Sequence, residues 1–518
     1  MSKTLKTAVL IFLFLFIPRL WILLNSSYTF YSDDAIYAIL ARSWTLGEWQ
    51  YVFHPTWPPL YPGLSAIIAL VIPGFENALR FTSLIFGTAV VIPLYFLLRH
   101  TMPQFFAISF SLAVAIFTPV LTMSLLPLSD SLAVFLIISG LVSVFLGLNL
   151  NDGHRLKLLL LGSGCFGLVY LTRTEGTMFF FLTLIFLLSQ IIRVRTKKYF
   201  LTVLLFITVF VITISPYVIA SRVQIGEWSL SPKFSAQIQQ GHAFALNNRG
   251  TTWAQEVTSP KAPDFQSHYF RNGTGYLLDR LYYFMRLYPE KQLKWQAVFL
   301  SIFPVWIIPL ILVGVASVLK GKSRWGEVYL IFIMAAAIPI TIFSTPVHDI
   351  RYLVWTIPLF LYFYYLGVLR VVKKGWATAI LALCAVFIFP GATVDNLINL
   401  RSLAGNFSRV YNRSELRDAG LWIKNHTSSP IPKVMIRHEG VEFYSGGEII
   451  YMPQVSYSGL LEYARKNSVD FLVAWDEELA GDNELVMLLD SRIEHPGLQK
   501  VYTALGKSRI IVYTLEEN

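Results

Sequence analysis

The chain has 518 residues, of which 55% are hydrophobic and 14% are charged, and its net charge is +11. Soluble globular proteins carry about 25% charged residues, so this composition excludes an ordinary soluble protein and indicates a polytopic α-helical membrane protein. No Lys/Arg-rich block with interleaved aromatic residues is present, which argues against nucleic acid as a partner. Cys165 and Cys384 both lie inside apolar runs, so the sequence predicts no disulfide framework.

Apolar runs long enough to cross a membrane recur along the first 400 residues. A spanning helix needs about 20 mainly apolar residues. We predict eleven spans, at residues 7–24, 78–98, 104–122, 129–149, 156–172, 176–192, 199–221, 296–319, 326–344, 352–370 and 375–393. The first run is too long for a signal peptide and lacks a small-residue cleavage site, so we expect an uncleaved span.

Positive charges between the spans predict the orientation. With the N-terminus in the cytoplasm, every inside connection carries lysine or arginine, whereas the short outside connections carry only Arg42, Arg173 and Arg351. This distribution follows the positive-inside rule. Eleven crossings then place the C-terminal region outside, and we expect the protein to lie in the plasma membrane.

Two outer loops are too long to be turns. In the first, residues 25–77, apolar residues at helical spacing predict an interfacial amphipathic helix over 34–46. A proline-rich turn follows at 55–63, and the short apolar stretch 64–72 is expected to lie in the interface. In the second loop, residues 222–295, an aromatic amphipathic helix is a candidate at 276–284.

The composition changes near residue 405, and residues 405–518 alternate between predicted helices and strands. We predict helices at 414–425, with Ser414 as its N-cap, and at 458–466. Short strands are predicted at 433–436, 448–451 and 470–474, and residues 501–502 and 509–513 are predicted to form a hairpin. This pattern is typical of a small α/β domain, which we expect outside the membrane.

Adjacent carboxylates follow the first span, at Asp33 and Asp34. A charge near hydrocarbon is unfavourable, so such a pair is a functional-site hypothesis by default. The predicted topology places further charged residues from other parts of the chain on the same outer side. These are Asp130, Arg173, Glu175, His348, Asp349 and Arg351.

The motifs around the acidic pair resemble those of GT-C glycosyltransferases. Asp33-Asp34 is followed by x-x-Tyr37-x-x-x-Ala41 and by the turn Pro58-Pro59-Leu60-Tyr61-Pro62. The resemblance is to the branch with protein O-mannosyltransferases and the lipid A aminoarabinose transferase, and it covers roughly the first 400 residues. Three later features match that branch too: Asp130 in the second outer loop, Thr172-Arg173-Thr174-Glu175-Gly176 at a span end, and Arg351-Tyr352-Leu353 before a late span.

The resemblance implies transfer of one sugar from a polyprenyl-phosphate donor to an acceptor on the outer face, with inversion. Asp33 matches the family's catalytic base, and Asp34 would support it. Arg351 is the first candidate for the donor phosphate, and Arg173 and Arg19 are second candidates. The other substrate-binding candidates are Tyr37, Trp57, Asp130, Glu175 and Tyr352. Trp57 stands where many relatives have a lysine. The Trp-Trp-Asp motif of oligosaccharyltransferases is absent from the sequence, which argues against transfer of a whole glycan.

Plainer interpretations of these residues remain open. Asp130 would also serve as an N-cap of the fourth span, Arg173 and Glu175 as a structural ion pair, and Arg351 and Arg19 as snorkelling side chains. His348 and Asp349 would suit a divalent metal, although no ligand spacing supports one. The donor sugar is expected to be a hexose such as mannose, and the acceptor a protein, a lipid or an envelope glycan. Rival functions are a transporter or flippase for a lipid-linked substrate and a non-catalytic envelope-assembly protein.

Overall fold

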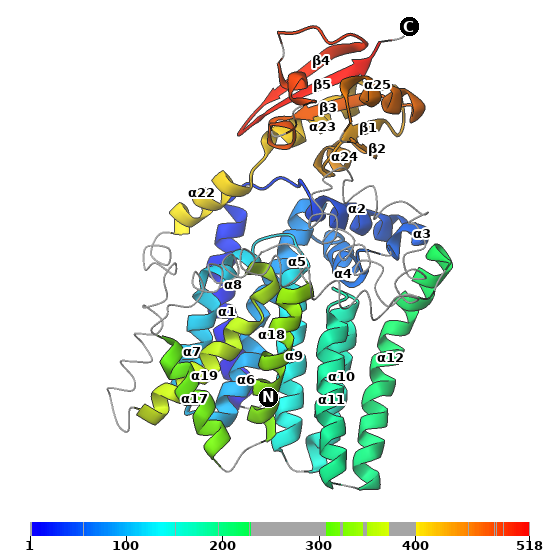
Figure 1. Cartoon of the computed structure of the whole chain (residues 1–518). Coiled ribbons are helices and arrows are strands. Elements are labelled where there is room, and N and C mark those ends of the chain that lie inside the picture. The colour runs from blue at the N-terminus through cyan, green and yellow to red at the C-terminus, as the bar shows by residue number, and fades with distance from the viewer. Residues whose placement is uncertain are drawn as a thin grey trace.

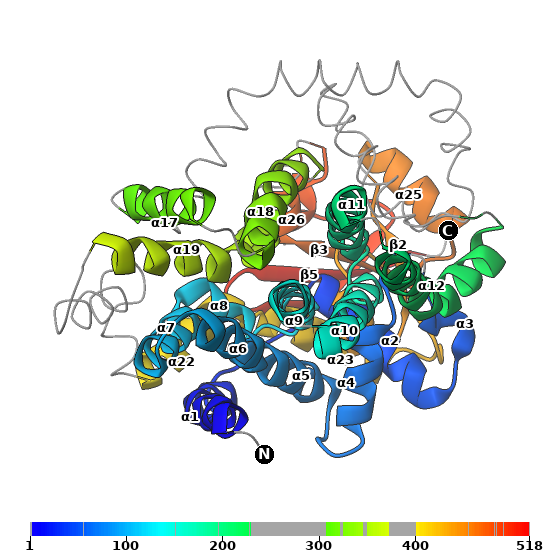
Figure 2. The same cartoon turned by 90° about the horizontal axis from the view of Figure 1, so that it is seen from below.

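The computed structural model describes residues 3–54, 56–150, 152–194, 196–226, 228, 307–321, 325–344, 350–371, 400–453, 455–480, 482, 484–490 and 492–516. A bundle of long helices carries a small α/β domain at one end (Figure 1). Viewed along the bundle, the strands β3 and β5 lie behind the helices, so the domain covers that end of the bundle (Figure 2).

The first outer loop forms short helices beneath the α/β domain. After α1 (Lys3–Leu24) come α2 (Asp33–Leu46), α3 (Trp49–Val52) and α4 (Leu60–Ala69). Leu46, Trp49 and Ile67 on these helices are exposed, as expected for elements that lie at a membrane interface. The predicted helix over 34–46 is present as α2, and its place at the membrane interface stays a prediction.

The remaining bundle helices follow the predicted spans. They are α5 (Phe75–Ala89), α6 (Val91–Thr101), α7 (Gln104–Ile116), α8 (Thr118–Met123), α9 (Asp130–Asn149), α10 (Asp152–Tyr170), α11 (Gly176–Val194), α12 (Lys197–Ile225), α17 (Ile308–Lys320), α18 (Trp325–Ser344) and α19 (Thr356–Val371), with the 3-10 helix η2 (Ile350–Leu353) before α19. The predicted span 375–393 and the candidate helix 276–284 lie outside the described residues.

Length and hydropathy qualify five of the described helical segments as membrane spans on their own. These segments are Lys3–Leu24, Phe75–Thr101, Asp130–Asn149, Tyr199–Gln224 and Trp325–Ile342. The predicted span 104–122 is divided into α7 and α8, because Phe117 is extended and Pro119 occupies the first turn of α8. Proline suits the start of a helix, where its missing N–H would have no partner.

Two glycines allow α17 and α19 to touch backbone to backbone. A Cβ on Gly314 would lie 1.9 Å from the Phe363 carbonyl oxygen, and a Cβ on Gly367 would lie 1.9 Å from the Leu310 carbonyl oxygen. Small residues permit this close approach between helices in membranes, where packing and not hydrophobicity drives association. No larger residue fits at either position without separating the helices.

The α/β domain contains one five-stranded sheet. Its strands are β1 (Lys433–Ile436), β2 (Glu448–Tyr451), β3 (Phe471–Trp475), β4 (Leu498–Leu505) and β5 (Arg509–Leu515), in the order β2-β1-β3-β5-β4. The first three are parallel, and β5 runs antiparallel to β3 and β4. The helical elements are α22 (Leu400–Tyr411), α23 (Ser414–His426), α24 (Gly440–Ser445), α25 (Tyr457–Lys466), α26 (Asp476–Leu479) and η3 (Val486–Leu489).

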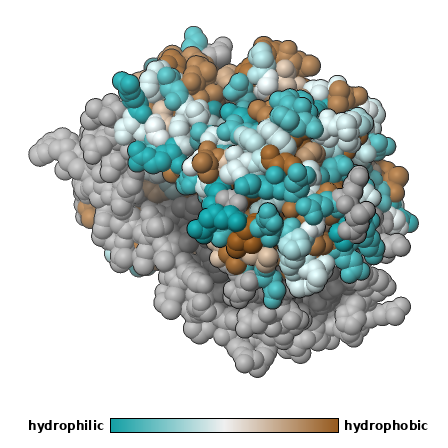
Figure 3. All heavy atoms as spheres, turned by 90° about the horizontal axis from the view of Figure 1, so that it is seen from above, coloured by the Kyte–Doolittle hydropathy of each residue, from teal (hydrophilic) through white to brown (hydrophobic). Residues whose placement is uncertain are grey.

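Alternating side chains of β1 cover both faces of the sheet with apolar groups. Val434 and Ile436 pack with Leu416 of α23 on one face, whereas Met435 packs with Leu460 of α25 on the other. The side of the domain turned away from the bundle is largely hydrophilic with scattered apolar residues, as expected for a surface in water (Figure 3). The predicted strands are present, and Ser414 is the first residue of α23 and not its N-cap.

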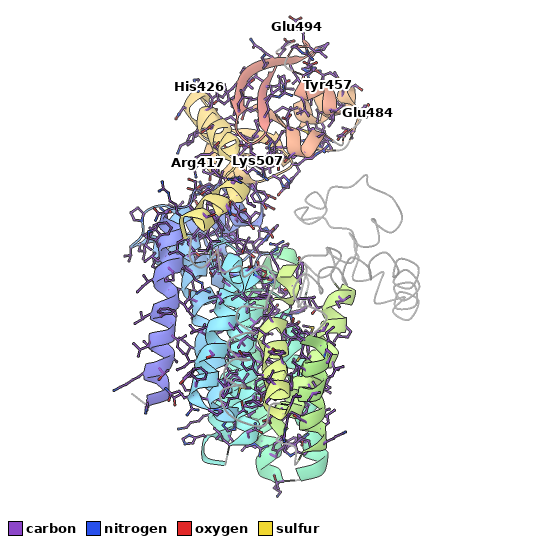
Figure 4. The ribbon with its side chains drawn as sticks, turned by 90° about the vertical axis from the view of Figure 1, so that its left-hand side faces the viewer. Arg417, His426, Tyr457, Glu484, Glu494 and Lys507 are labelled. Atoms are coloured by element: carbon purple, nitrogen blue, oxygen red, sulfur yellow. The ribbon has the colours of Figure 1, made fainter. Side chains whose placement is uncertain are left out.

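The domain is joined to the bundle by hydrogen bonds around Glu76. The Arg417 guanidinium donates to a Glu76 carboxylate oxygen at 2.7 Å and to the Tyr28 carbonyl oxygen at 2.7 Å. The Tyr444 hydroxyl also donates to Glu76, and it accepts the Phe30 backbone N–H at 3.1 Å. Figure 4 shows Arg417 at the lower border of the domain, next to the bundle. Arg417 of α23 and Tyr444 of α24 thus both bind the segment that leads into the acidic pair.

Candidate active site

Asp34 is buried and fully engaged by its own segment. Its carboxylate accepts the Tyr28 hydroxyl at 2.8 Å, the Ser32 backbone N–H at 2.7 Å and the Tyr31 backbone N–H at 3.2 Å. Burial raises the pKa of Asp34 to about 6, against the effect of these donors, which favour the charged form. Asp34 therefore fixes the loop that precedes α2.

Asp33 is half-buried and differs from its neighbour in having an unengaged carboxylate. Within the described part of the chain, it makes no hydrogen bond or ion pair. Its negative charge acts on Tyr37 and Tyr352 in the bundle, and on His438 and Glu439 in the α/β domain. The charge of the first acid of the pair thus influences groups in both parts of the molecule.

A network of charges connects three of the predicted outer segments. The Arg173 guanidinium pairs with Asp130 at 2.5 Å and with Glu175 at 3.1 Å. The Arg351 guanidinium lies 3.9 Å from the other oxygen of Asp130. Arg173 also lies over the Tyr352 ring, 5.2 Å from its centroid. The structure therefore brings all five of these predicted residues together.

Tyr37 connects α2 to this network. Its hydroxyl is 2.8 Å from the Ser129 hydroxyl, directly before Asp130, and its ring packs edge-on against Tyr61 at 5.1 Å. Asp130 is the first residue of α9, and Ser129 occupies the cap position without a side-chain cap bond. Asp130 thus binds Arg173 and does not act as the N-cap of α9.

The proline-rich turn contacts the segment that carries Arg173. Trp57 is 2% exposed and packs against the His54 ring, with 4.8 Å between centroids. The Leu60 backbone N–H donates to the Leu171 carbonyl oxygen at 2.9 Å, which ties the turn to the segment that carries Arg173. The Trp57 backbone N–H also donates to the His54 Nδ1 atom at 3.4 Å.

Arg19 is held elsewhere. Its guanidinium donates to the Ser124 hydroxyl at 3.1 Å, to the Leu15 carbonyl oxygen at 3.2 Å and to the Ala115 carbonyl oxygen. These bonds connect α1 to α7 and to the end of α8 inside the bundle. Arg19 is thus a structural residue in this arrangement and is separate from the Asp130 network.

Residues of the α/β domain near Asp33 were not expected from the sequence. His438 and Glu439 follow β1, and Glu478 lies in α26 after β3. Burial raises the pKa of Glu439 to about 7 and that of Glu478 to about 8. The signal available in the sequence was an Arg-His-Glu-Gly run at the end of a predicted parallel strand, where α/β folds place ligands.

No group of three or more histidine, cysteine, aspartate or glutamate residues suited to a metal ion occurs among the residues described. His348 and Asp349, the candidate metal pair, lie outside them.

Comparison with known proteins identifies the fold. No protein-family model and no curated protein matches the chain. Among solved structures, ArnT from Cupriavidus metallidurans bound to undecaprenyl phosphate aligns with a TM-score of 0.61 at 13% identity, over 99% of this chain and 98% of that chain. The apo oligosaccharyltransferase of Archaeoglobus fulgidus aligns with a TM-score of 0.60 at 14% identity, over 91% of this chain and 70% of that chain. The chain has the fold of GT-C glycosyltransferases.

This result confirms the predicted fold class, a helical membrane module of GT-C type with a small C-terminal α/β domain, and the chain is an integral membrane protein. A third GT-C structure, AglB from Archaeoglobus fulgidus in complex with an inhibitory peptide and a dolichol-phosphate, aligns with a TM-score of 0.56 at 14% identity, over 92% of this chain and 70% of that chain. At such identities the similarity shows the fold, and the roles of single residues rest on the geometry of the site.

Proposed function

We propose that the protein is an inverting glycosyltransferase that transfers one sugar from a polyprenyl-phosphate donor to an acceptor hydroxyl, with Asp33 as the general base. The observation that carries this proposal is the contrast within the acidic pair. Asp34 is buried and occupied by three donors, whereas Asp33 is half-buried, makes no hydrogen bond among the described residues and lies near Tyr352. A base must have an oxygen available for the proton it removes.

The reaction then has a simple balance of bonds. Asp33 takes the proton of the acceptor hydroxyl as that oxygen forms a bond to the anomeric carbon. The bond between the anomeric carbon and the phosphate oxygen breaks on the opposite face of the sugar, and the polyprenyl phosphate leaves with the electron pair. Attack and departure on opposite faces invert the anomeric centre, as in inverting sugar transfer generally.

Negative charge develops on the leaving phosphate, so cations aimed at it stabilise the transition state. Arg351 is the proposed phosphate ligand, because its side chain is 33% exposed and it lies in η2, at the start of a predicted span. Arg173 is 18% exposed and held by two carboxylates, which suits a residue that positions the site. A guanidinium at the end of a span can reach a lipid phosphate at headgroup depth.

A lipid-phosphate donor is also supported by the fold. The aligned ArnT structure is described as bound to undecaprenyl phosphate, and an aligned AglB structure contains a dolichol-phosphate. We propose a hexose such as mannose as the sugar, and a protein, lipid or envelope glycan as the acceptor. The positive-inside pattern supports a site on the outer face of the plasma membrane, with the N-terminus in the cytoplasm.

The position of the charges favours an enzyme over a transporter. A transporter binds its substrate near the middle of the membrane, between two related halves. Here Asp130 pairs with Arg173 and Arg351 at the span ends, close to α2 and the covering domain.

The test is transfer by the full chain in lipid nanodiscs, with radiolabelled undecaprenyl-phosphate hexoses as donors. The acceptor panel contains a threonine-rich peptide, octyl mannoside and a membrane lipid extract. Asp33→Asn should lower the rate at least about 100-fold, because a positioned general base contributes that much or more. Asp418→Asn, at an exposed position of α23, is the matched control.

Two outcomes would contradict the proposal. Equal rates for Asp33→Asn and Asp418→Asn would remove Asp33 as the base. Absence of transfer by the wild-type protein across the panel would count against the glycosyltransferase and favour the transporter or envelope-assembly functions.

A further inference from the structure

The carboxyl ends of two parallel strands of the α/β domain point toward the acidic pair. His438 and Glu439 lie two and three residues beyond the end of β1, and Glu478 lies in the short helix that follows β3. Open sheets with parallel strands bind ligands at this edge, outside the carboxyl ends of the strands. In this protein the edge faces α2, so it borders the site proposed above.

Backbone contact holds this edge against the loop before Asp33. A Cβ on Gly440 would lie 2.5 Å from the Phe30 carbonyl oxygen and 3.0 Å from the Tyr31 Cα. On the same helix, the Tyr444 hydroxyl accepts the Phe30 N–H. Only glycine permits this approach, and Gly440 is therefore fixed beside Phe30 and Tyr31, two residues after His438.

His438 lies beside Glu478, with 4.0 Å between its Nε2 atom and Glu478 Oε1. Burial lowers the pKa of His438, the negative charge of Asp33 opposes this shift, and Arg437 adds to it. The His438 side chain is 41% exposed, which leaves room for a ligand.

Glu478 gives an independent sign of an incomplete site. Its side chain is 2% exposed, and its second oxygen accepts the Arg437 backbone N–H at 3.3 Å. Oε1 is buried and has no hydrogen-bond partner among the described residues. Buried polar atoms without a partner are rare, because such an atom loses its hydrogen bonds to water and gains none in the fold. An imidazole N–H of His438 that rotates toward Glu478 would satisfy this oxygen.

We propose that His438 positions the acceptor: Glu478 orients its imidazole, which hydrogen-bonds the acceptor beside the hydroxyl that Asp33 deprotonates. This inference rests on the proposed glycosyl transfer. It also narrows the acceptor class, because the negative charge of Asp33 would repel an anion. The acceptor end that enters the site is therefore a neutral polyol and not a phosphorylated group.

The first test needs no acceptor and measures whether His438 and Asp33 share one site. Histidine-labelled protein in nanodiscs is titrated by NMR, with the His438 signal assigned through His438→Gln. Asp33→Asn should lower the pKa of His438 by about half a unit or more, because it removes the nearby negative charge. Asp418→Asn should leave it unchanged. An unchanged value in Asp33→Asn would overturn the inference, whatever the activity of the protein.

The second test is kinetic and compares octyl mannoside with its 6-phosphate as acceptors. We expect the wild type to prefer the neutral compound. His438→Gln should raise the acceptor KM about five- to tenfold, the effect of one lost hydrogen bond, with the donor KM unchanged. His426→Gln is the matched control, since this histidine stacks on Trp422 at the far end of α23 (Figure 4).

The outcomes separate the two proposals. An unchanged acceptor KM in His438→Gln, or a preference for the phosphorylated compound, would overturn the acceptor role of His438 and leave glycosyl transfer intact. Loss of all transfer in the wild type would overturn the proposed function, and the titration alone would then decide whether His438 belongs to the site of Asp33.

Discussion

At the scale of single residues, two chemically identical side chains one position apart have different environments. Asp34 binds three donors of its own loop, whereas Asp33 starts α2, and its charge influences Tyr352 and His438. A carboxylate that accepts several hydrogen bonds is a structural element, because each bond would be left unsatisfied without it. The pair therefore combines a rigid support with an available base.

Asp34→Asn should change how stability depends on pH. The pKa of Asp34 rises from its ordinary value near 3.8 to about 6 in the folded protein, because the side chain is buried. The folded state then binds more protons than the unfolded state between these values, so this contribution to stability is present at low pH and lost as pH rises through about 6. In thermal unfolding in detergent from pH 4 to 7.5, the wild-type midpoint should fall relative to that of Asp34→Asn.

Asp418→Asn should retain the wild-type slope in the same experiment, because Asp418 is exposed. Parallel slopes for the wild type and Asp34→Asn would show that Asp34 carries no such proton linkage.

At the scale of elements, hydropathy and strand patterns are strong local signals. They predict helices at ten of the eleven spans within the described residues, and strands at β1, β2, β3 and the β4–β5 hairpin. The six-residue helix α24 could not be predicted, because so short a segment shows no period. The sequence also contains Gly314 and Gly367 without any sign that they meet, since their contact depends on how two helices cross.

Gly314→Ala should lower the stability of the bundle. Its new methyl group would lie 1.9 Å from a backbone oxygen of α19, so the helices must separate. Overpacking of this kind typically costs about 1–3 kcal/mol. We expect a lower thermal midpoint in fluorescence-detected size-exclusion chromatography. Gly164→Ala is the matched control, because its Cβ would meet only Val209 Cγ1 at 3.8 Å. Equal midpoints for the two variants would show that the α17–α19 contact is looser than described.

At the scale of the whole molecule, the site lies where the bundle and the α/β domain meet. The motifs Asp33-Asp34, Asp130, Arg173-Glu175 and Arg351-Tyr352 could be predicted to converge, because the topology places them on one side. The approach of His438 and Glu478 could not be predicted, because they lie more than about 400 residues after Asp33 and only the docking of the domain brings them near. The sequence alone contains no information on that docking angle.

Glu76→Ala should loosen this docking. Glu76 accepts hydrogen bonds from Arg417 and Tyr444, one residue from each of two helices of the domain. Loss of a shared acceptor costs about 1–2 kcal/mol, so the amide hydrogen of Phe30, bound to Tyr444, should exchange about tenfold faster. Hydrogen–deuterium exchange of peptides from residues 28–34 measures this. Glu462→Ala, at an exposed position of α25, is the control, and equal exchange in the two variants would exclude Glu76 as the anchor.

The hydrogen bond between Phe30 and Tyr444 joins residues 414 positions apart, so its two partners are synthesised at different times. Domains fold as the chain emerges, N-terminal parts first. The loop with the acidic pair leaves the ribosome early, whereas its partner helix α24 and the strand β5 of the same domain are synthesised much later. A nascent chain therefore holds an incomplete site until α24 has been synthesised, and the enzyme proposed here would begin to act only after that point.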